Sequence, residues 1–423
     1  MKNASNKAFV DHRRWKMSMT LVGVSILALV TAGCGGSIST HPKAAVNVGV
    51  IAGYTGSYVS FSDDLLNGVK VASALIDAHG GIMGRRVHLI PINDGLDPVD
   101  TVPAIQKMLA TDNVQLVCGL AALDYQAGLP VLNKAHMVSM SYIGPDYGPV
   151  VMPYHWNMNP ADDELGLAMA YYAHEKGVHR IAVVFDSSLG AQSIEPSVVS
   201  AARKLHLTIV AKPQVPETAT SYQSVIQQVI NAKPQMVLLQ VEPAQAGAFF
   251  QQWQSLGAGS LPIVGTDVTI DQQWLQAVGP AEIAHVVSVE GETRTTSPFY
   301  KTFVSTWANV IKQPFSYVGS FMYDGMTLAA LAMEEAHSTN PRIYRKYISD
   351  VSQPGPGKTD VYSYEQGVKL LKAGKKIKYV GITGPLTFNK YHRPTGDYGV
   401  YQGVLNGNSV SLATIPAEKL VGL

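Results

Sequence analysis

The sequence of 423 residues contains only two cysteines, Cys34 and Cys118, so a framework of several disulfide bonds is excluded. It also lacks an excess of charge, since 32 Lys and Arg residues nearly balance 31 Asp and Glu residues. Nucleic-acid binding needs a basic surface, and this composition argues against it. After Cys34 no apolar run approaches the length that crosses a membrane.

Motifs for catalysis or metal binding are also missing. His174 and His179 are five residues apart, whereas two histidines that bind zinc from one helix face are four apart. No serine lies in the turn motif of a hydrolase nucleophile. We therefore expect no metal, no cofactor and no enzymatic activity. The alternative, a secreted α/β hydrolase, requires a nucleophile at a strand end close to a histidine, and we find none.

The N-terminus has the layout of a secretion signal. An apolar stretch over residues 21–30 follows five basic residues: Lys2, Lys7, Arg13, Arg14 and Lys16. The run Leu29-Val30-Thr31-Ala32-Gly33-Cys34 resembles a bacterial lipobox, which implies a lipid on Cys34 and removal of the signal peptide, residues 1–33. Residues 34–45 then predict a flexible tether. The alternative is a simple secretory signal with a chance cysteine, and both readings place the protein outside the cytoplasm.

Beyond the tether, β-branched strands alternate with amphipathic helices. We expect strands near residues 46–51, 87–92, 114–118, 138–141, 180–185, 207–211, 236–240, 262–264 and 286–290. Helices are expected near 125–135, 162–175, 192–205, 221–232, 244–256, 298–312 and 320–336. This alternation predicts parallel sheets covered by helices on both faces. In such sheets ligands bind beyond the carboxyl ends of the strands, so the loops after residues 51, 118, 141, 185, 240 and 264 are candidates.

Two local sequence patterns predict the first helices of the fold. Leu65, Val69, Ala72 and Ile76 form one apolar stripe at helical spacing. The dipeptide Asp97-Pro98 has the residue types of an N-cap followed by the first helical position. Both signals predict a helix between consecutive strands of a parallel sheet.

A series of residues and short motifs occurs in a characteristic order along the chain: Gly56, Gly68, Gly80-Gly81-Ile82-Met83-Gly84-Arg85, Asp94, Asp97-Pro98, Gly119, Tyr323-Asp324-Gly325, Tyr364-Glu365-Gln366-Gly367-Val368-Lys369 and Gly381-Ile382-Thr383-Gly384-Pro385-Leu386-Thr387-Phe388. In their order and spacing they resemble the type I periplasmic solute-binding proteins, in the branched-chain amino acid receptor group. The resemblance covers nearly all of residues 46–415.

The resemblance implies an α/β fold of two Rossmann-like lobes with parallel central sheets, joined by a hinge of three strands. We expect lobe 1 to comprise residues 46–160 and 292–385, and lobe 2 to comprise residues 161–291 and 386–423. It also implies a monomer that closes on a small solute and delivers it to the permease of an ABC importer. A receptor module that senses a ligand is the alternative within the same fold.

The resemblance also locates candidate ligand contacts on lobe 1. In the family, hydroxyl side chains there hold a ligand carboxylate. In this sequence the corresponding loops read Leu120-Ala121-Ala122-Leu123-Asp124-Tyr125 and Tyr142-Ile143-Gly144-Pro145, without Ser or Thr. This departure argues against an α-amino-acid carboxylate at that place. Our candidates here are Phe61, Leu123, Asp124, Tyr125, Tyr142 and Ile143. Three of them, Phe61, Tyr125 and Tyr142, belong to a group of aromatic residues expected around the cleft, which also includes Tyr54, Tyr58 and Tyr147.

On lobe 2 the candidates are two acids. The resemblance implies that Asp267 pairs with a ligand ammonium, and a desolvated ammonium needs such a partner. Asp267 could instead cap a helix ahead of Asp271. Glu242, before Pro243, either faces the ligand or is an acid at a helix start, favoured by the helix dipole. Together with Asp124, these acids predict a pocket for a cationic or amide-rich ligand rather than a plain hydrophobic amino acid.

Overall fold

The computed structural model describes residues 44–56, 58–145, 148, 151–216 and 218–423. Cys34, with the predicted signal peptide, lies outside the described residues, as does Tyr147. The segment Lys43–Leu423 forms one compact unit. Among its described residues no helix is both long and apolar enough to cross a membrane.

The first sheet has five parallel strands in the order β2-β1-β3-β4-β5. These strands are β1 (Val46–Ala52), β2 (Val87–Asn93), β3 (Leu116–Gly119), β4 (Ser139–Ser141) and β5 (His155–Asn157). The helices that connect them are α1 (Val59–Ala78), α2 (Pro98–Thr111) and α3 (Tyr125–Lys134). The whole predicted stripe of α1, from Leu65 to Ile76, is fully buried, and the Asp97 side chain accepts a hydrogen bond from the Val99 amide at the start of α2.

The second sheet follows the order β16-β15-β11-β10-β9-β6-β7, with β8 paired to β6. Its strands are β6 (Arg180–Asp186), β7 (Thr208–Ala211), β8 (Gln214–Val215), β9 (Met236–Gln240), β10 (Ile263–Gly265), β11 (Val286–Gly291), β15 (Tyr398–Gln402) and β16 (Val410–Ile415). Its helices are α4 (Asp162–Glu175), α5 (Leu189–Lys204), α6 (Gln223–Ala232), α7 (Pro243–Ser255), η1 (Asp267–Ile270), α8 (Gln272–Val278) and α9 (Pro280–Ile283). Strands β15 and β16 run antiparallel at its edge, a feature that the alternation of strands and helices does not predict.

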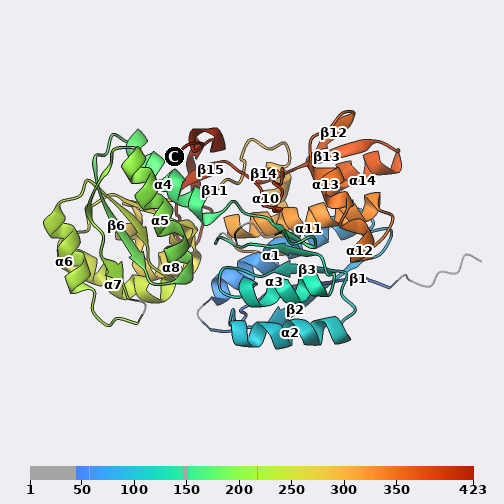
Figure 1. Ribbon diagram of the computed structural model, residues 1–423, viewed down its shortest axis with the longest axis horizontal. Helices are drawn as coiled ribbons and strands as arrows, with labels where there is room; N and C mark the ends of the chain where they lie inside the picture. Colours follow the sequence, from blue (N-terminus) through green and yellow to red (C-terminus); the bar gives the residue numbers. More distant parts are fainter. Residues whose placement is uncertain (1–43, 57, 146–147, 149–150, 217) are drawn as a thin grey trace, which may run out of the picture. The chain divides into compact units, whose positions relative to one another are not determined.

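The chain returns to the first sheet after β11. Helices α10 (Tyr300–Val310) and α11 (Tyr317–Glu335) come first, and α11 packs along α1 (Figure 1). A third, small sheet of β12 (Lys358–Val361), β13 (Lys376–Gly381) and β14 (Gly384–Pro385) follows, together with α12 (Pro341–Tyr344), α13 (Tyr347–Ser352) and α14 (Tyr364–Lys372). The chain ends with β15, β16 and the short η2 (Ala417–Lys419).

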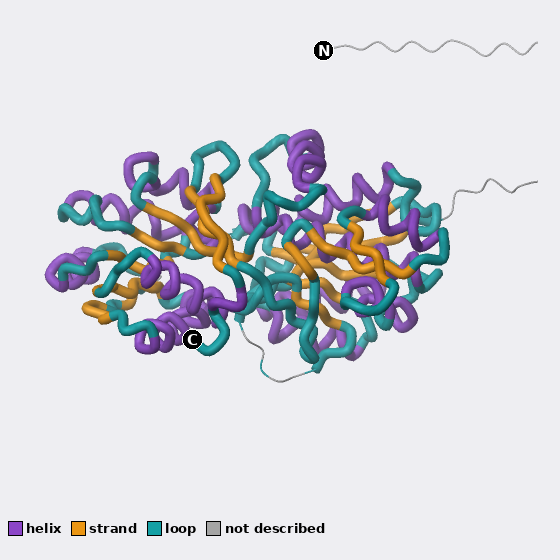
Figure 2. The backbone as a smooth tube through the Cα atoms, turned by 90° about the horizontal axis from the view of Figure 1, so that it is seen from above, coloured by secondary structure: helices purple, strands orange, loops and turns teal. Residues whose placement is uncertain are grey.

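The connectivity confirms the predicted fold class. The chain passes between the two large sheets three times, through residues 158–161, 292–299 and 386–397, and both sheets have helices on their faces (Figure 2). Crossings of this kind allow a hinge. The lobe boundaries given above stay a prediction.

The contact between α1 and α11 depends on glycine. A Cβ atom on Gly68 would lie 1.9 Å from the carbonyl oxygen of Gly319, which is far inside any allowed contact. We expect Gly68→Ala to lower the free energy of unfolding by about 1–3 kcal/mol, because overpacking forces the two helices apart. Urea denaturation measures the change.

The matched control is Gly190→Ala in α5. A Cβ atom there would meet only the Gln240 Nε2 atom, at 3.4 Å. The free energy of unfolding should stay the same or rise by up to about 1 kcal/mol, since alanine favours a helix over glycine. Equal losses in the two variants would contradict the account of the α1–α11 contact.

Candidate functional site

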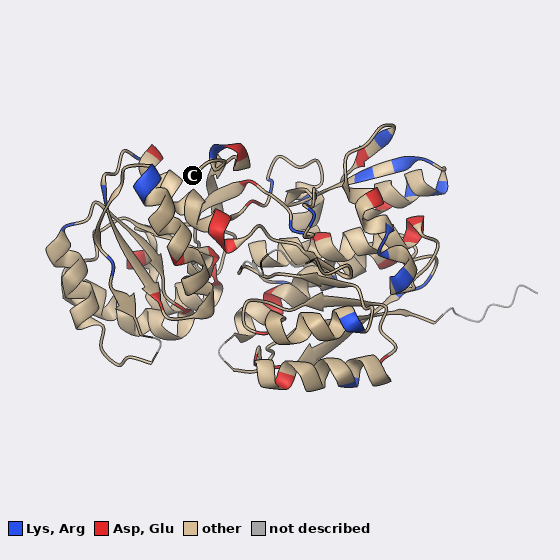
Figure 3. Ribbon diagram, in the orientation of Figure 1, with Lys and Arg blue, Asp and Glu red and all other residues tan. Residues whose placement is uncertain are grey.

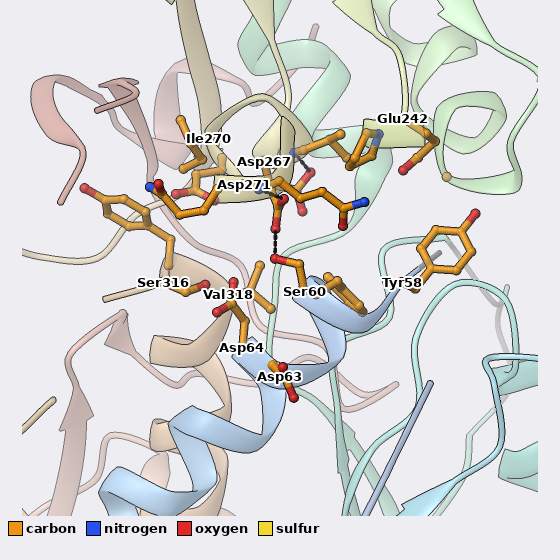
Figure 4. A pocket seen from close by; sticks show the side chains of 18 of the residues that line it. Tyr58, Ser60, Asp63, Asp64, Glu242, Asp267, Ile270, Asp271, Ser316 and Val318 are labelled. Atoms are coloured by element: carbon orange, nitrogen blue, oxygen red, sulfur yellow. Dashed lines mark hydrogen bonds between the residues drawn. The ribbon is translucent and has the colours of Figure 1, made fainter. Parts of the chain in front are cut away.

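A cavity of about 590 Å³ lies where the carboxyl ends of the strands of both large sheets meet. All six loops selected from the sequence contribute to its lining, through Tyr58, Ala121, Tyr142, Ser188, Glu242 and Asp267. Two hydrogen bonds cross it, each between a side chain near the first sheet and a side chain near the second. The Tyr142 hydroxyl donates to Asp267 Oδ2 (3.1 Å), and the Ser60 hydroxyl donates to Asp271 Oδ2 (2.8 Å; Figure 4).

The lining of the cavity is strongly acidic. Seven carboxylic acids line it: Asp63, Asp64, Asp162, Glu242, Asp267, Asp271 and Glu290. No Lys, Arg or His occurs among the described lining residues. Basic residues lie instead on helix α14 and on strand β13 of the small sheet (Figure 3). No residue of α14 or β13 lines the cavity. An acidic cavity without a basic partner favours a cationic ligand.

Asp267 begins η1 two residues after the last residue of β10, Gly265, at the edge of the second sheet where the cavity lies. Besides the bond from Tyr142, its carboxylate accepts a hydrogen bond from the Val268 amide (3.1 Å). Burial raises the pKa of this carboxyl, and the hydrogen bonds oppose that rise. The helix cap of α8 is Asp271, which accepts from the Gln273 and Trp274 amides. Capping of α8 therefore does not explain why an acid occupies position 267.

Glu242 occupies the N-cap position of α7, but its side chain makes no capping hydrogen bond. The carboxylate instead accepts hydrogen bonds from the Ser188 hydroxyl (3.4 Å) and from Gln240 Nε2 (3.3 Å). Burial, followed by repulsion from Asp186, raises the pKa of Glu242 to about 8. The side chain thus faces the cavity, while its backbone starts the helix.

Aromatic and apolar side chains from α1 and from the loops that follow β3 and β4 complete the lining. Phe61 and Tyr142 both line the cavity and pack edge to face, with ring centroids 5.8 Å apart, and Leu123 also lines it. Tyr58 lines the cavity as well, whereas Tyr54 does not. Aromatic walls of this kind can contact both an alkyl chain and a cation.

Three candidates do not reach the lining of the cavity. Asp124 is buried, and its Oδ1 atom accepts a hydrogen bond from the Ala121 amide (2.6 Å). Burial, followed by repulsion from Asp94, raises the pKa of Asp124 well above its usual range. Tyr125 and Ile143 are buried in the apolar cluster between the first sheet and α2 and α3. The structure therefore brings Phe61, Leu123, Tyr142, Glu242 and Asp267 together, and places these three behind them.

Sequence reasoning missed the most deeply buried acid of the cavity. Glu290 is near the end of the apolar strand β11, has 1% of its surface exposed, and lines the cavity. Neither carboxylate oxygen has a hydrogen-bond partner. Burial raises the pKa of Glu290 well above its usual range, with repulsion from Asp267 and Asp64 adding to the effect. An acid at the carboxyl end of an apolar strand was the signal that could have identified it.

Comparison with known proteins agrees with this architecture. The model of the periplasmic binding protein family matches residues 45–408. An amino acid binding protein from Pseudomonas aeruginosa is 22% identical over 329 residues, covering 77% of this chain and 87% of that protein. Leu/Ile/Val-binding protein homolog 3 from Brucella melitensis is 23% identical, covering 60% of this chain and 70% of that protein.

Solved structures share the fold. A leucine-binding protein from Thermotoga maritima superposes with a TM-score of 0.72 at 15% identity, covering 88% of this chain and 99% of that one. A solute-binding protein of an ABC transporter from R. palustris, in complex with benzoate, gives 0.71 at 14% identity, covering 88% and 97%. The chain therefore belongs to the periplasmic binding protein family, with the fold of the type I solute-binding proteins.

Proposed function

We propose that this protein is a lipid-anchored, extracytoplasmic receptor that delivers a small solute with a protonated amine to an ABC importer. The observation that carries the proposal is the cavity lined by seven carboxylic acids with no basic residue among its described lining. Cys34 attaches the lipid, and residues 34–45 tether the receptor near its permease. A monomer suffices for this role, and no covalent step is involved.

The arrangement of the acids explains how such a ligand would close the protein. Asp267 and Glu242 follow strands of the second sheet, while Leu123 and Tyr142 follow strands of the first sheet and Phe61 lies on α1. An ammonium between them replaces its hydration with carboxylates and aromatic faces. Because the two lobes contact the ligand together, its binding energy shifts the hinge equilibrium toward the closed form.

A ligand that carries only negative charge fits this cavity poorly. Proteins of similar structure bind ligands that carry a carboxylate. The R. palustris protein is in complex with benzoate, and a substrate-binding protein from Streptococcus pneumoniae is in complex with isoleucine. A buried carboxylate would need a basic side chain as its counter-charge, and none occurs among the described lining residues. Burying an anion beside several carboxylates without a counter-charge is unfavourable.

The amine proposal predicts the effect of Asp267→Asn. Loss of the charge should weaken an amine-bearing ligand by about 1.5–3 kcal/mol, the usual contribution of a hydrogen bond to a charged group. Isothermal titration of aliphatic amines, amino acids, amides and aromatic acids into the protein measures the change. The matched control is Asp163→Asn, since Asp163 is exposed and does not line the cavity. Unchanged affinity in the Asp267 variant, or tight binding of an acid without an amine, would refute the proposal.

A further inference from the structure

Glu290 differs from the other acids of the cavity. Asp267, Asp271 and Glu242 each accept hydrogen bonds from protein donors, as described above, and Asp162 accepts one from the Ser193 hydroxyl. Both oxygens of Glu290 have no partner, although only 1% of the residue is exposed. A buried carboxylate without donors is costly, and a donor supplied by a ligand would remove that cost.

A second unsatisfied acceptor lies in the same lining. Gln240 is 3% exposed, and its Nε2 atom donates to Glu242 while its Oε1 atom has no partner. The cavity thus presents three buried acceptor atoms without donors, the two oxygens of Glu290 and Oε1 of Gln240. Acceptors call for N–H groups of a ligand, and an ammonium carries three.

The acids of the cavity come from separate segments of the chain. Asp64 lies on α1, Glu290 lies on β11, and Glu242 lies well apart from Asp64 at the start of α7 (Figure 4). One ammonium can neutralise only some of these acids, since it pairs with carboxylates within hydrogen-bond distance.

We propose that the ligand is a linear organic dication, an aliphatic diamine or polyamine, with one ammonium at Asp267 and Glu242 and the second at Glu290. This proposal rests on the proposed function and names its ligand class. The side chains of Val268, Ile270 and Val318 line the same cavity and offer apolar surface for the methylene chain. Among the described residues no group of three or more His, Cys, Asp or Glu side chains is arranged to hold a metal ion, which favours an extended organic cation over a divalent metal.

The test compares ligands that differ by one charge. The α,ω-diamines of butane, hexane and octane, each with its own monoamine, are titrated calorimetrically into the full protein at fixed pH and ionic strength. The best diamine should bind about 10- to 150-fold more tightly than its monoamine, the range expected for a further hydrogen bond to a charged group. Equal affinity within each pair would overturn the inference while leaving the amine function intact. Tight binding of aromatic acids, with no binding of amines, would remove both.

Two variants assign the second ammonium to Glu290. Glu290→Gln should weaken the diamine about 10- to 150-fold and change the affinity of the monoamine by less than about threefold. Glu292→Gln, two residues along the chain and outside the lining of this cavity, should change neither. Equal weakening of both ligands by Glu290→Gln would overturn the assignment, as would calcium or magnesium ions that bind as tightly as the diamine. If Glu290→Gln failed to fold, the comparison of diamine with monoamine in the unmodified protein would decide alone.

Discussion

Lowering the pH from about 8 to about 6 should weaken the binding of an amine-bearing solute by about 10- to 100-fold. Burial raises the pKa of Glu242 and of Asp64 to about 8 and that of Asp162 to about 7, and it also raises the pKa values of Asp267, Asp271 and Glu290. The empty cavity therefore holds protons near neutral pH. A cation binds the ionised carboxylates, so each proton that binding releases changes the affinity by about tenfold per pH unit.

The sign of this dependence separates a cationic ligand from an anionic one. An aliphatic amine keeps its own proton over this pH range, so the carboxyl groups alone decide the trend. An anion would bind the protonated cavity better and gain affinity at low pH. Calorimetric titration in two buffers with different ionisation enthalpies counts the protons released. An affinity that stays constant, or that rises on acidification, would contradict the account.

Asp324→Ala should lower the free energy of unfolding by about 3–5 kcal/mol, because it breaks a buried hydrogen-bond network. The buried Asp324 carboxylate of α11 accepts hydrogen bonds from the Tyr379 hydroxyl (2.7 Å), the Ile382 amide (3.0 Å), and the amide and hydroxyl of Thr383 (2.9 and 2.6 Å). Alanine leaves these donors without an acceptor in the interior, which is unfavourable for each of them. The loss should also loosen residues 382–383, which precede the third crossing between the sheets.

Urea unfolding of Asp324→Ala beside Asp350→Ala measures this effect. Asp350 is exposed on α13, so its removal should change the free energy of unfolding by less than about 0.5 kcal/mol. Similar midpoints for the two variants would show that the buried carboxylate does not hold this part of the fold together.

Much of the fold follows from local patterns in the sequence. The stripe on α1 is buried because its four residues repeat at the helical period, and α2 begins at Pro98 because Asp97 caps it. The alternation of strands and helices places the candidate loops at the carboxyl ends of the strands, and all six contribute to the cavity. Periodicity and capping depend on neighbours in sequence, so one sequence is enough to identify them.

Other features depend on contacts that the sequence does not display. Gly119, the last residue of β3, and Leu120, the first residue of the following loop, have φ values of 105° and 66°, so the chain turns sharply there. In the residues that follow, the Asp124 carboxylate accepts from the Ala121 amide instead of lining the cavity. The sequence does not identify Glu290 for the same reason, since the acids that repel it, Asp64 and Asp267, come from distant segments of the chain. The antiparallel pair β15 and β16 is likewise fixed by pairing with β11 rather than by its own pattern.

The identity of the solute that the protein carries from the cell separates a receptor for amines from a receptor for acids. Native mass spectrometry of the gently purified protein, followed by release and chemical identification of the bound compound, gives that answer. The acidic cavity predicts a retained amine, with two amino groups if Glu290 has the role proposed above. A retained carboxylic acid that lacks any amine would contradict it.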